Sequence, residues 1–307
     1  MAKVFIDGSA GTTGLRIRDR LACRKDMELL ILPEELRKDP GARAEALNSA
    51  DISFLCLPDA AAVEAASLVA NPEAVVIDTS TAHRVAEGWV YGMPELAGQR
   101  EKVKAAKRIA NPGCHATGFI SLVAPLVSAG LIRKGARLSC FSLTGYSGGG
   151  KKMIAEYEAP GADPLYEAPR QYGLGQNHKH LPEMAKVCGL DHAPVFCPVV
   201  APYYAGMEVT VPLTPEETSA TPEQIREVYR EYYRSGLIRP GEGTDENGFL
   251  SAAAFRGRDD LEVSVFGGGE RMVLVSRFDN LGKGASGAAI QNMNVVLGLN
   301  EAEGLVV

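Results

Sequence analysis

The N-terminal stretch KVFIDGSAGTTGLRIRDRLA constrains the fold more than any other part of the chain. A short apolar strand stops at a glycine, and apolar residues then recur at helical spacing from Leu15 to Leu21. Gly8, Gly11 and Gly14 lie between them, where glycines let the backbone approach a pyrophosphate at the positive end of a helix. A plain turn is the alternative. The predicted cofactor-binding residues of this turn are Gly8, Ser9, Ala10, Gly11, Thr12, Thr13 and Gly14.

Three more short apolar segments follow, ELLIL, DISFLCLP and AVVIDTS, and stretches rich in alanine and glutamate separate them. Strands that alternate with helices indicate a parallel, doubly wound sheet of the Rossmann type. The first domain is therefore expected to be α/β.

The pattern changes after Cys114, where most apolar segments alternate with polar residues. Such strands are typical of an antiparallel or mixed sheet, so we expect a second, α+β domain. Its one clear helix is TPEQIREVYREYYRSGLI, with Thr221 as N-cap and Gln224 closing a capping box. The predicted strands are RLSCFSLTGYSG, PVFCPVVAPYY, MEVTVPLT, LEVSVFGG and RMVLVSRFDN.

Composition and charge exclude several classes of protein. A formal net charge of −6 and the lack of a basic cluster argue against a nucleic-acid partner. The longest mainly apolar run, 119–132, contains Pro125 and is shorter than the roughly 18 residues that a membrane span needs. Six scattered cysteines without metal-type spacing indicate a reducing compartment and no metal site. We therefore expect a cytoplasmic protein without a membrane partner.

The cofactor preference depends on the residues that follow the second strand. A dinucleotide fold selective for NAD places an acidic residue at the tip of that strand to bind the ribose hydroxyls. Here the strand ends without one, and Arg37 and Lys38 follow in LILPEELRKD. Two cations in this place favour the 2′-phosphate of NADP. A solvated helix end is the alternative reading of the pair.

A second glycine-rich stretch, TGYSGGGKK, resembles part of a nucleotide phosphate loop. Gly145, Gly150 and Lys151 fit the spacing, but position 152 is lysine, so the hydroxyl that holds magnesium is missing. The segment instead offers Ser147, Lys151 and Lys152 as an anion cradle. A surface turn is the alternative.

The stretch ANPGCHATG places Cys114 behind a Pro-Gly corner and before a predicted helix. The N–H groups and dipole of a helix start favour a thiolate, which makes Cys114 a candidate nucleophile. Asn111 and His115 flank it. The other five cysteines are expected to be structural.

A thiolate near a nicotinamide suggests that an acyl group is caught as a thioester and reduced to an aldehyde, or the reverse. Such chemistry needs a proton shuttle, and NHKHLPE offers His178 and His180. On an extended segment the two would point to opposite faces, so only one should meet the sulfur. Ordinary polar loop residues are the alternative, and the pair lacks partners spaced for a metal.

Taken together, these segments resemble the N-acetyl-γ-glutamyl-phosphate reductase family, the NADP-dependent enzymes of arginine biosynthesis, in its shorter-chain form. The resemblance runs over nearly the whole chain, and VYGMPEL, ANPGCHAT and HKHLPE are its most specific segments. The other segments are GSAGTTG, GYSGGGKK and GKGASGAAIQNMNVVLG.

The resemblance implies a dinucleotide-binding domain at 1–114, a catalytic and oligomerisation domain at 115–284, and a C-terminal helix at 285–307 that returns to the first domain. It also implies a homo-oligomer, dimer or tetramer. Cys114 would be the nucleophile and His180 the general acid/base, with His178 as the alternative. Gly287 and Asn292 would lie on the nicotinamide side of NADP. The implied substrate-binding residues are Asn111, Ser147, Lys151, Lys152, His178 and Glu183, the last also placed to orient an imidazole.

One departure from the family pattern concerns the substrate anion. Longer members carry an arginine where this chain reads APYYAGM, so that contact is absent or comes from another residue. Three alternative functions stay open: an aspartate-semialdehyde dehydrogenase, a reductase of carrier-bound acyl phosphates, and a non-catalytic NADPH sensor. Only the sensor has no need of a reactive thiol.

Overall fold

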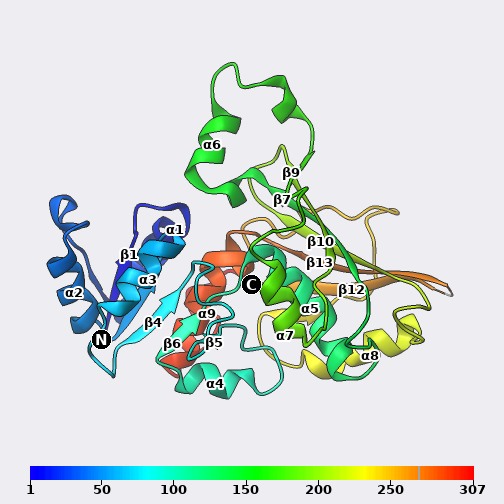
Figure 1. The fold of residues 1–307 in the computed structure, drawn as a ribbon, viewed down its shortest axis with the longest axis horizontal. Coiled ribbons are helices and arrows are strands. Elements are labelled where there is room, and N and C mark those ends of the chain that lie inside the picture. The colour runs from blue at the N-terminus through cyan, green and yellow to red at the C-terminus, as the bar shows by residue number, and fades with distance from the viewer. Residues whose placement is uncertain (269) are drawn as a thin grey trace. The chain divides into compact units, whose positions relative to one another are not determined.

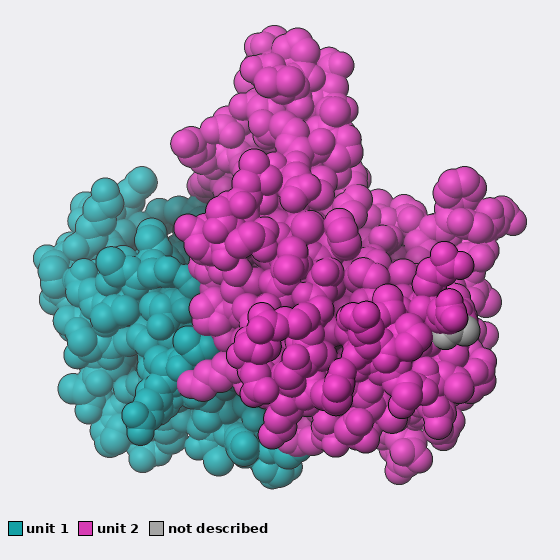
Figure 2. Space-filling model, turned by 45° about the vertical axis from the view of Figure 1, so that its right-hand side comes forward, with its two compact units in different colours: residues 1–94, 98–112, 285–305 teal, residues 95–97, 113–284, 306–307 magenta. Residues whose placement is uncertain are grey.

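A computed structural model of the protein describes residues 1–268 and 270–307. The described chain forms two compact units, which Figure 2 colours separately. Unit 1 comprises Met1–Pro94, Gly98–Pro112 and Ala285–Leu305, and unit 2 comprises Glu95–Ala97, Gly113–Gly284 and Val306–Val307. The division of the chain into domains after residues 114 and 284 stays a prediction.

Unit 1 is built on a six-stranded sheet in which every strand pair is parallel. In spatial order its strands are β2 (Met27–Leu30), β1 (Ala2–Asp7), β3 (Ile52–Leu55), β4 (Val75–Asp78), β6 (Arg108–Ala110) and β5 (Val90–Tyr91). Its helices are α1 (Thr12–Leu21), α2 (Pro40–Ser49), α3 (Asp59–Ser67), α4 (Gln99–Ala105) and α9 (Gly287–Val296), with a 3₁₀ turn at Glu34–Leu36.

Apolar side chains point to both faces of this sheet, which explains why helices cover both faces. Val4 and Ile6 of β1 pack with α1, α4 and α9, whereas Phe5 between them packs with α2 and α3. Successive residues of a strand point to opposite faces, so a run of apolar residues needs cover on both sides. The doubly wound sheet predicted from the sequence is thus confirmed.

Unit 2 contains a seven-stranded mixed sheet, also as predicted. In spatial order its strands are β11 (Ile238–Pro240), β12 (Leu261–Gly268), β13 (Arg271–Phe278), β10 (Met207–Leu213), β7 (Ser139–Gly145), β9 (Val195–Ala201) and β8 (Arg170–Gln171). Its helices are α5 (Cys114–Ser128), α6 (Gly150–Glu158), α7 (Leu181–Cys188) and α8 (Pro222–Tyr232), with 3₁₀ turns at Tyr146–Gly149 and Pro164–Glu167. A π-helical turn spans Gly282–Ser286.

Helix α5 is the buried centre of unit 2 and contains a proline inside its last turns. Pro125 has no N–H, so the carbonyl of Ser121 lacks its usual partner within the helix. The hydroxyl of Tyr233 donates a 2.7 Å hydrogen bond to that carbonyl, and the hydroxyl of Tyr229 donates one of 2.8 Å to Leu122. The predicted capping box of α8 is present at Thr221. Tyr229 and Tyr233 therefore pack on α5, and Tyr233 replaces the hydrogen bond that the proline removes.

The face of the unit 2 sheet that points away from α5 carries exposed apolar side chains. Phe141 on β7 is 47% exposed and Val195 on β9 is 58% exposed. Figure 1 shows α6 and the turn after it extending away from this sheet.

No helix in the described ranges is long and apolar enough to cross a membrane.

Candidate active site and cofactor site

The predicted cofactor turn joins β1 to α1 in unit 1. Gly8 has a φ of +84°, and a Cβ there would lie 2.3 Å from the carbonyl oxygen of Cys56. A Cβ on Gly14 would lie 2.5 Å from the carbonyl oxygen of Gly8. Both positions therefore require glycine. Gly11 is the N-cap of α1, Ser9 and Ala10 complete the turn, and Thr13 lies in the first helical turn.

The start of α1 suits an anion. No side chain caps it, so its first N–H groups remain available. The hydroxyl of Thr12 is buried and has no hydrogen-bond partner among the described residues. A phosphate at this helix start would accept from both kinds of donor.

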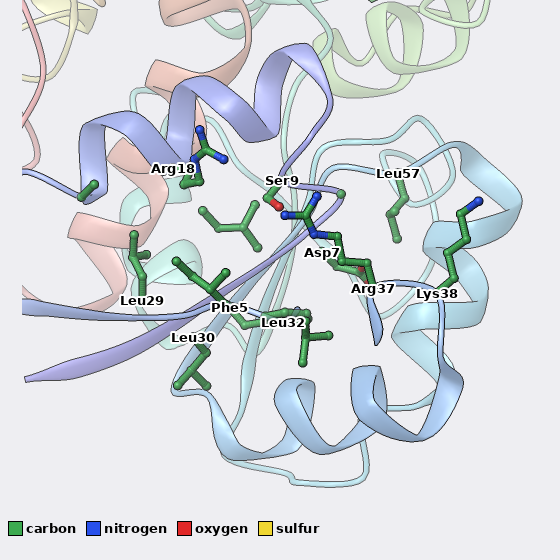
Figure 3. A pocket seen from close by; sticks show the side chains of 14 residues that line it. Phe5, Asp7, Ser9, Arg18, Leu29, Leu30, Leu32, Arg37, Lys38 and Leu57 are labelled. Atoms are coloured by element: carbon green, nitrogen blue, oxygen red, sulfur yellow. The ribbon is translucent and has the colours of Figure 1, made fainter. Parts of the chain in front are cut away.

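A cavity of about 440 Å³ opens between β1, α1 and the end of β2 (Figure 3). Arg37 and Lys38 line it, as do Arg18 and Ser9. In Figure 3 the guanidinium of Arg37 points toward Ser9, while Lys38 extends away from it. The other lining residues are Phe5, Ile6, Asp7, Gly8, Ala22, Leu29, Leu30, Ile31, Leu32 and Leu57.

Asn111 and Asn292 form a buried amide pair in unit 1. The side-chain N–H of Asn292 donates to the side-chain oxygen of Asn111 at 3.2 Å and to the carbonyl of Gly92 at 2.8 Å. Asn111 donates in turn to the carbonyl of Ala285 at 3.0 Å. The side-chain oxygen of Asn292 is buried without a partner in the part of the chain described. Gly287, also buried, begins α9.

Cys114 is the first residue of the 15-residue helix α5, in unit 2. Gly113 before it is extended and offers no side-chain cap, so the positive end of the helix dipole meets the sulfur. Cys114 is half-buried, and a Cβ on Gly284 would come within 3.0 Å of its Cβ. All six cysteines are free thiols. Burial raises the pKa of Cys56 to about 12 and raises those of Cys140 and Cys188 as well.

Glu183 connects the corner before Cys114 with a histidine. One carboxylate oxygen accepts a 3.2 Å hydrogen bond from the N–H of Gly113, and the other lies 4.0 Å from Nε2 of His180. Both side chains are buried. The structure therefore brings His180 and Glu183 together at the start of α5.

The prediction that His178 and His180 lie on an extended segment and point to opposite faces is wrong. His180 has helical angles, φ −87° and ψ −12°, at the N-cap of α7. The resulting turn brings the two rings to 4.7 Å between centroids. The N–H of His180 donates to Nδ1 of His178 at 3.2 Å, so a neutral His178 carries its proton on Nε2.

A third imidazole, which the sequence indicated only as a neighbour of Cys114, completes this cluster. His115 lies 5.5 Å from both His178 and His180, measured between ring centroids. Its nitrogens contact the hydroxyls of Ser142 and Tyr172, each at 2.7 Å. Burial, and then His178, lower the pKa of His115 to about 3, so it stays neutral.

Tyr172 was also missed. Burial, and then the charge of Cys114, raise the pKa of Tyr172, so the phenol stays protonated. Its only sequence signal is its position six residues before His178.

The three residues of the predicted anion cradle differ in burial. Ser147 is buried, and its hydroxyl accepts a 3.0 Å hydrogen bond from the side-chain N–H of Asn280. Lys151 and Lys152 are exposed in the first turn of α6, and Lys152 lies 3.9 Å from Glu156. Near the APYYAGM segment, the guanidinium of Arg256 lies 5.9 Å from the ring centroid of Tyr204.

Both units match known protein families. Residues 9–106 match the semialdehyde dehydrogenase NAD-binding domain, and residues 114–280 match the semialdehyde dehydrogenase dimerisation domain. The aspartate-semialdehyde dehydrogenase II of Vibrio cholerae, complexed with ASA, is 17% identical with a TM-score of 0.71, and the alignment covers 97% of this chain and 98% of that one. The Candida albicans enzyme with NADP is 15% identical with a TM-score of 0.67, over 97% and 98% of the two chains. The two domain matches together place the chain in the semialdehyde dehydrogenase family.

Curated relatives narrow this class. N-acetyl-γ-glutamyl-phosphate reductase 2 of Pseudomonas putida is 43% identical over 98% of each chain. The Rhizobium etli reductase is 46% identical over 96% of this chain and 98% of its own. The Nostoc reductase 2 is 44% identical over 99% of each. The chain belongs to the N-acetyl-γ-glutamyl-phosphate reductase family.

Proposed function

We propose that the protein reduces N-acetyl-γ-glutamyl phosphate to N-acetylglutamate γ-semialdehyde and phosphate with NADPH, in arginine biosynthesis. The observation that carries the proposal is Cys114 at the start of α5, with Glu183 bridging Gly113 and His180. The identity of the substrate is inferred from the names of the relatives reported above. The reducing cytoplasm suits six free thiols.

The first chemical step is acylation of Cys114. Its thiolate attacks the acyl carbon, the new C–S bond forms, and phosphate leaves with the electron pair of the broken C–O bond. Backbone N–H groups of the first turn of α5 stabilise the oxyanion. The hydroxyl of Ser147 accepts from Asn280, which leaves its own hydrogen free to donate to the phosphate. Lys151 and Lys152 add positive charge for the substrate anion.

The second step is reduction of the thioester. NADPH, when bound, supplies the hydride that converts the thioester to a thiohemiacetal on Cys114. His180 moves the proton as the thiohemiacetal collapses, and Glu183 orients its imidazole. His178, with Nδ1 occupied by the His180 N–H, presents its Nε2 to the substrate anion. Tyr172 and the neutral His115 hold this cluster in place.

The residues of unit 1 fit NADP. The unpartnered hydroxyl of Thr12 and the uncapped start of α1 suit the pyrophosphate, and Arg37 in the cavity suits the 2′-phosphate. The unpartnered side-chain oxygen of Asn292 suits the carboxamide N–H of the nicotinamide.

Replacing Arg37 and Lys38 together with alanine is expected to raise the Michaelis constant for NADPH about tenfold and that for NADH far less. The reason is the loss of charge-assisted hydrogen bonds to the 2′-phosphate, which NADH lacks. Steady-state kinetics with each cofactor measures the difference. Arg37→Ala alone should carry most of it, because Lys38 extends away from Ser9. Unchanged use of NADPH would assign the 2′-phosphate to another group.

The homo-oligomer is proposed to form through the exposed sheet face of unit 2, with a second copy as its partner. Phe141 and Val195 are exposed there, in the part that matches a dimerisation domain. Phe141→Glu should lower the sedimentation coefficient toward that of a monomer, whereas Phe249→Glu, on an exposed loop, should not. An unchanged coefficient for Phe141→Glu would place the interface elsewhere.

A substrate panel tests the proposed function directly. N-acetyl-γ-glutamyl phosphate, γ-glutamyl phosphate, β-aspartyl phosphate and a carrier-bound acyl phosphate are compared by kcat/KM with NADPH. The N-acetylated compound is expected to exceed the others by about a hundredfold or more, because a site built to bind an amide rejects analogues without it. A preference for β-aspartyl phosphate would make the protein an aspartate-semialdehyde dehydrogenase instead.

A further inference from the structure

The cofactor cavity of unit 1 has an acidic side chain in its wall. Asp7, the last residue of β1, is the one acidic residue among the described residues that line the cavity, and Arg18, Arg37 and Lys38 are its cations. A carboxylate here repels any phosphate that the cavity takes up. The fold must therefore offset the charge of Asp7 from another direction.

Arg43 offsets it from behind the cavity wall. It lies on α2 and is only 7% exposed, and it is not among the lining residues. Its Nε lies 3.0 Å from Oδ2 of Asp7 and its Nη2 lies 2.9 Å from the same oxygen. Its remaining nitrogen contacts Glu64 of α3 at 3.4 Å. The guanidinium therefore binds protein carboxylates and does not line the cavity.

We propose that Arg43 is a positioning residue for the cofactor: it neutralises Asp7, so that the cavity presents a net positive surface to the phosphates of a dinucleotide. The inference rests on the proposed function, because it takes the cavity to hold a phosphorylated dinucleotide. Asp7 directly precedes Gly8, so the Asp7–Arg43 pair lies beside the first glycine of the turn.

With the pair intact we expect cofactor affinity to vary little with pH, whereas loss of Arg43 should make it depend on pH. Burial raises the pKa of Asp7, Arg43 lowers it, and Glu64 raises it. The other ionisable groups facing this region are Cys56 beyond β3 and the cavity cations Arg18, Arg37 and Lys38. Without Arg43 the pKa of Asp7 rises further. Asp7 is then uncharged at the acidic end of the range and repels phosphate at the alkaline end.

The test is direct binding of NADPH to four variants of the whole protein, by calorimetry at about pH 6 and about pH 8. Arg43→Met should raise the Kd about tenfold at the higher pH and much less at the lower one. Asp7→Asn with Arg43→Met should restore the Kd to within about threefold and remove the pH dependence. Asp7→Asn alone should tighten binding. Arg108→Met is the matched control, since this part-buried arginine donates to the carbonyls of Ala74 and Lys107.

Thermal melts of each variant separate binding from folding. The inference is overturned if Arg43→Met binds like the unaltered protein, or if the double variant melts normally but stays weak. Should Arg43→Met fail to fold, Asp7→Asn decides: tighter binding supports the inference, and weaker binding overturns it. The same series with NADH separates this inference from the cofactor proposal, because the pyrophosphate is common to both. A preference for NADH with the same Arg43 pattern defeats only the choice of NADP.

Discussion

Replacing Cys114 with alanine is expected to lower kcat for acyl phosphate reduction by more than about 10⁴-fold, since loss of a nucleophile removes the whole covalent path. NADPH binding should be unchanged, because the cofactor site belongs to unit 1. Steady-state assays and calorimetry measure the two quantities. Cys23→Ser is the matched control: Cys23 is exposed, and its loss should leave kcat unaltered.

Iodoacetamide labelling gives the same prediction a second readout. At neutral pH, Cys114 should react far ahead of Cys140 and Cys188, whose burial keeps them as thiols. Inactivation without modification of Cys114, or turnover by Cys114→Ala within tenfold of the unaltered protein, would contradict its assignment.

The second large effect concerns the two histidines. His180→Asn should reduce kcat by about two to four powers of ten, the usual contribution of a positioned acid/base, and leave NADPH affinity near normal. His178→Asn should instead raise the KM for the acyl phosphate, because its Nδ1 is already bonded to the N–H of His180. Because the two ring centroids lie only 4.7 Å apart, the two variants remove imidazoles from nearly the same surroundings, so a difference between them reports their separate roles.

Glu183→Gln provides the control for this pair. It retains a hydrogen-bond acceptor for Gly113 but removes the charge beside His180, so kcat should fall while KM stays near normal. Single-turnover kinetics decides between the histidines. Slow acylation in His178→Asn but not in His180→Asn would mean that the two roles are exchanged.

The sequence predicted the parts of this molecule that depend on local pattern. Buried runs such as VVID and alternating runs such as MEVTV report how many faces of a strand are covered, so both sheets followed from them. The helix start at Cys114 followed from the Pro-Gly corner, because proline and glycine act on the backbone of their own neighbours.

Contacts between distant segments were beyond such patterns. His115 meets Ser142 and Tyr172 through the packing of α5 on the sheet, a separation of 27 and 57 residues that no periodicity records. The prediction about the two histidines was wrong for a related reason. Helix α7 begins directly after His180, with Pro182 in its first turn. The chain therefore turns at His180, whereas the i, i+2 spacing suggested an extended segment. Arg43 was equally hidden, because an arginine inside a helix gives no sign that Asp7 lies beneath it.

The central claim is that an acyl phosphate is converted to a thioester on Cys114 before reduction. Mixing the protein with N-acetyl-γ-glutamyl phosphate in the absence of NADPH, followed by acid quench and mass spectrometry of its peptides, tests this most directly. We expect stoichiometric release of phosphate and one N-acetylglutamyl group on the peptide that contains Cys114, removed on addition of NADPH as the semialdehyde forms. Full reductase turnover without an acyl group on Cys114, or with the group on another residue, would contradict the account.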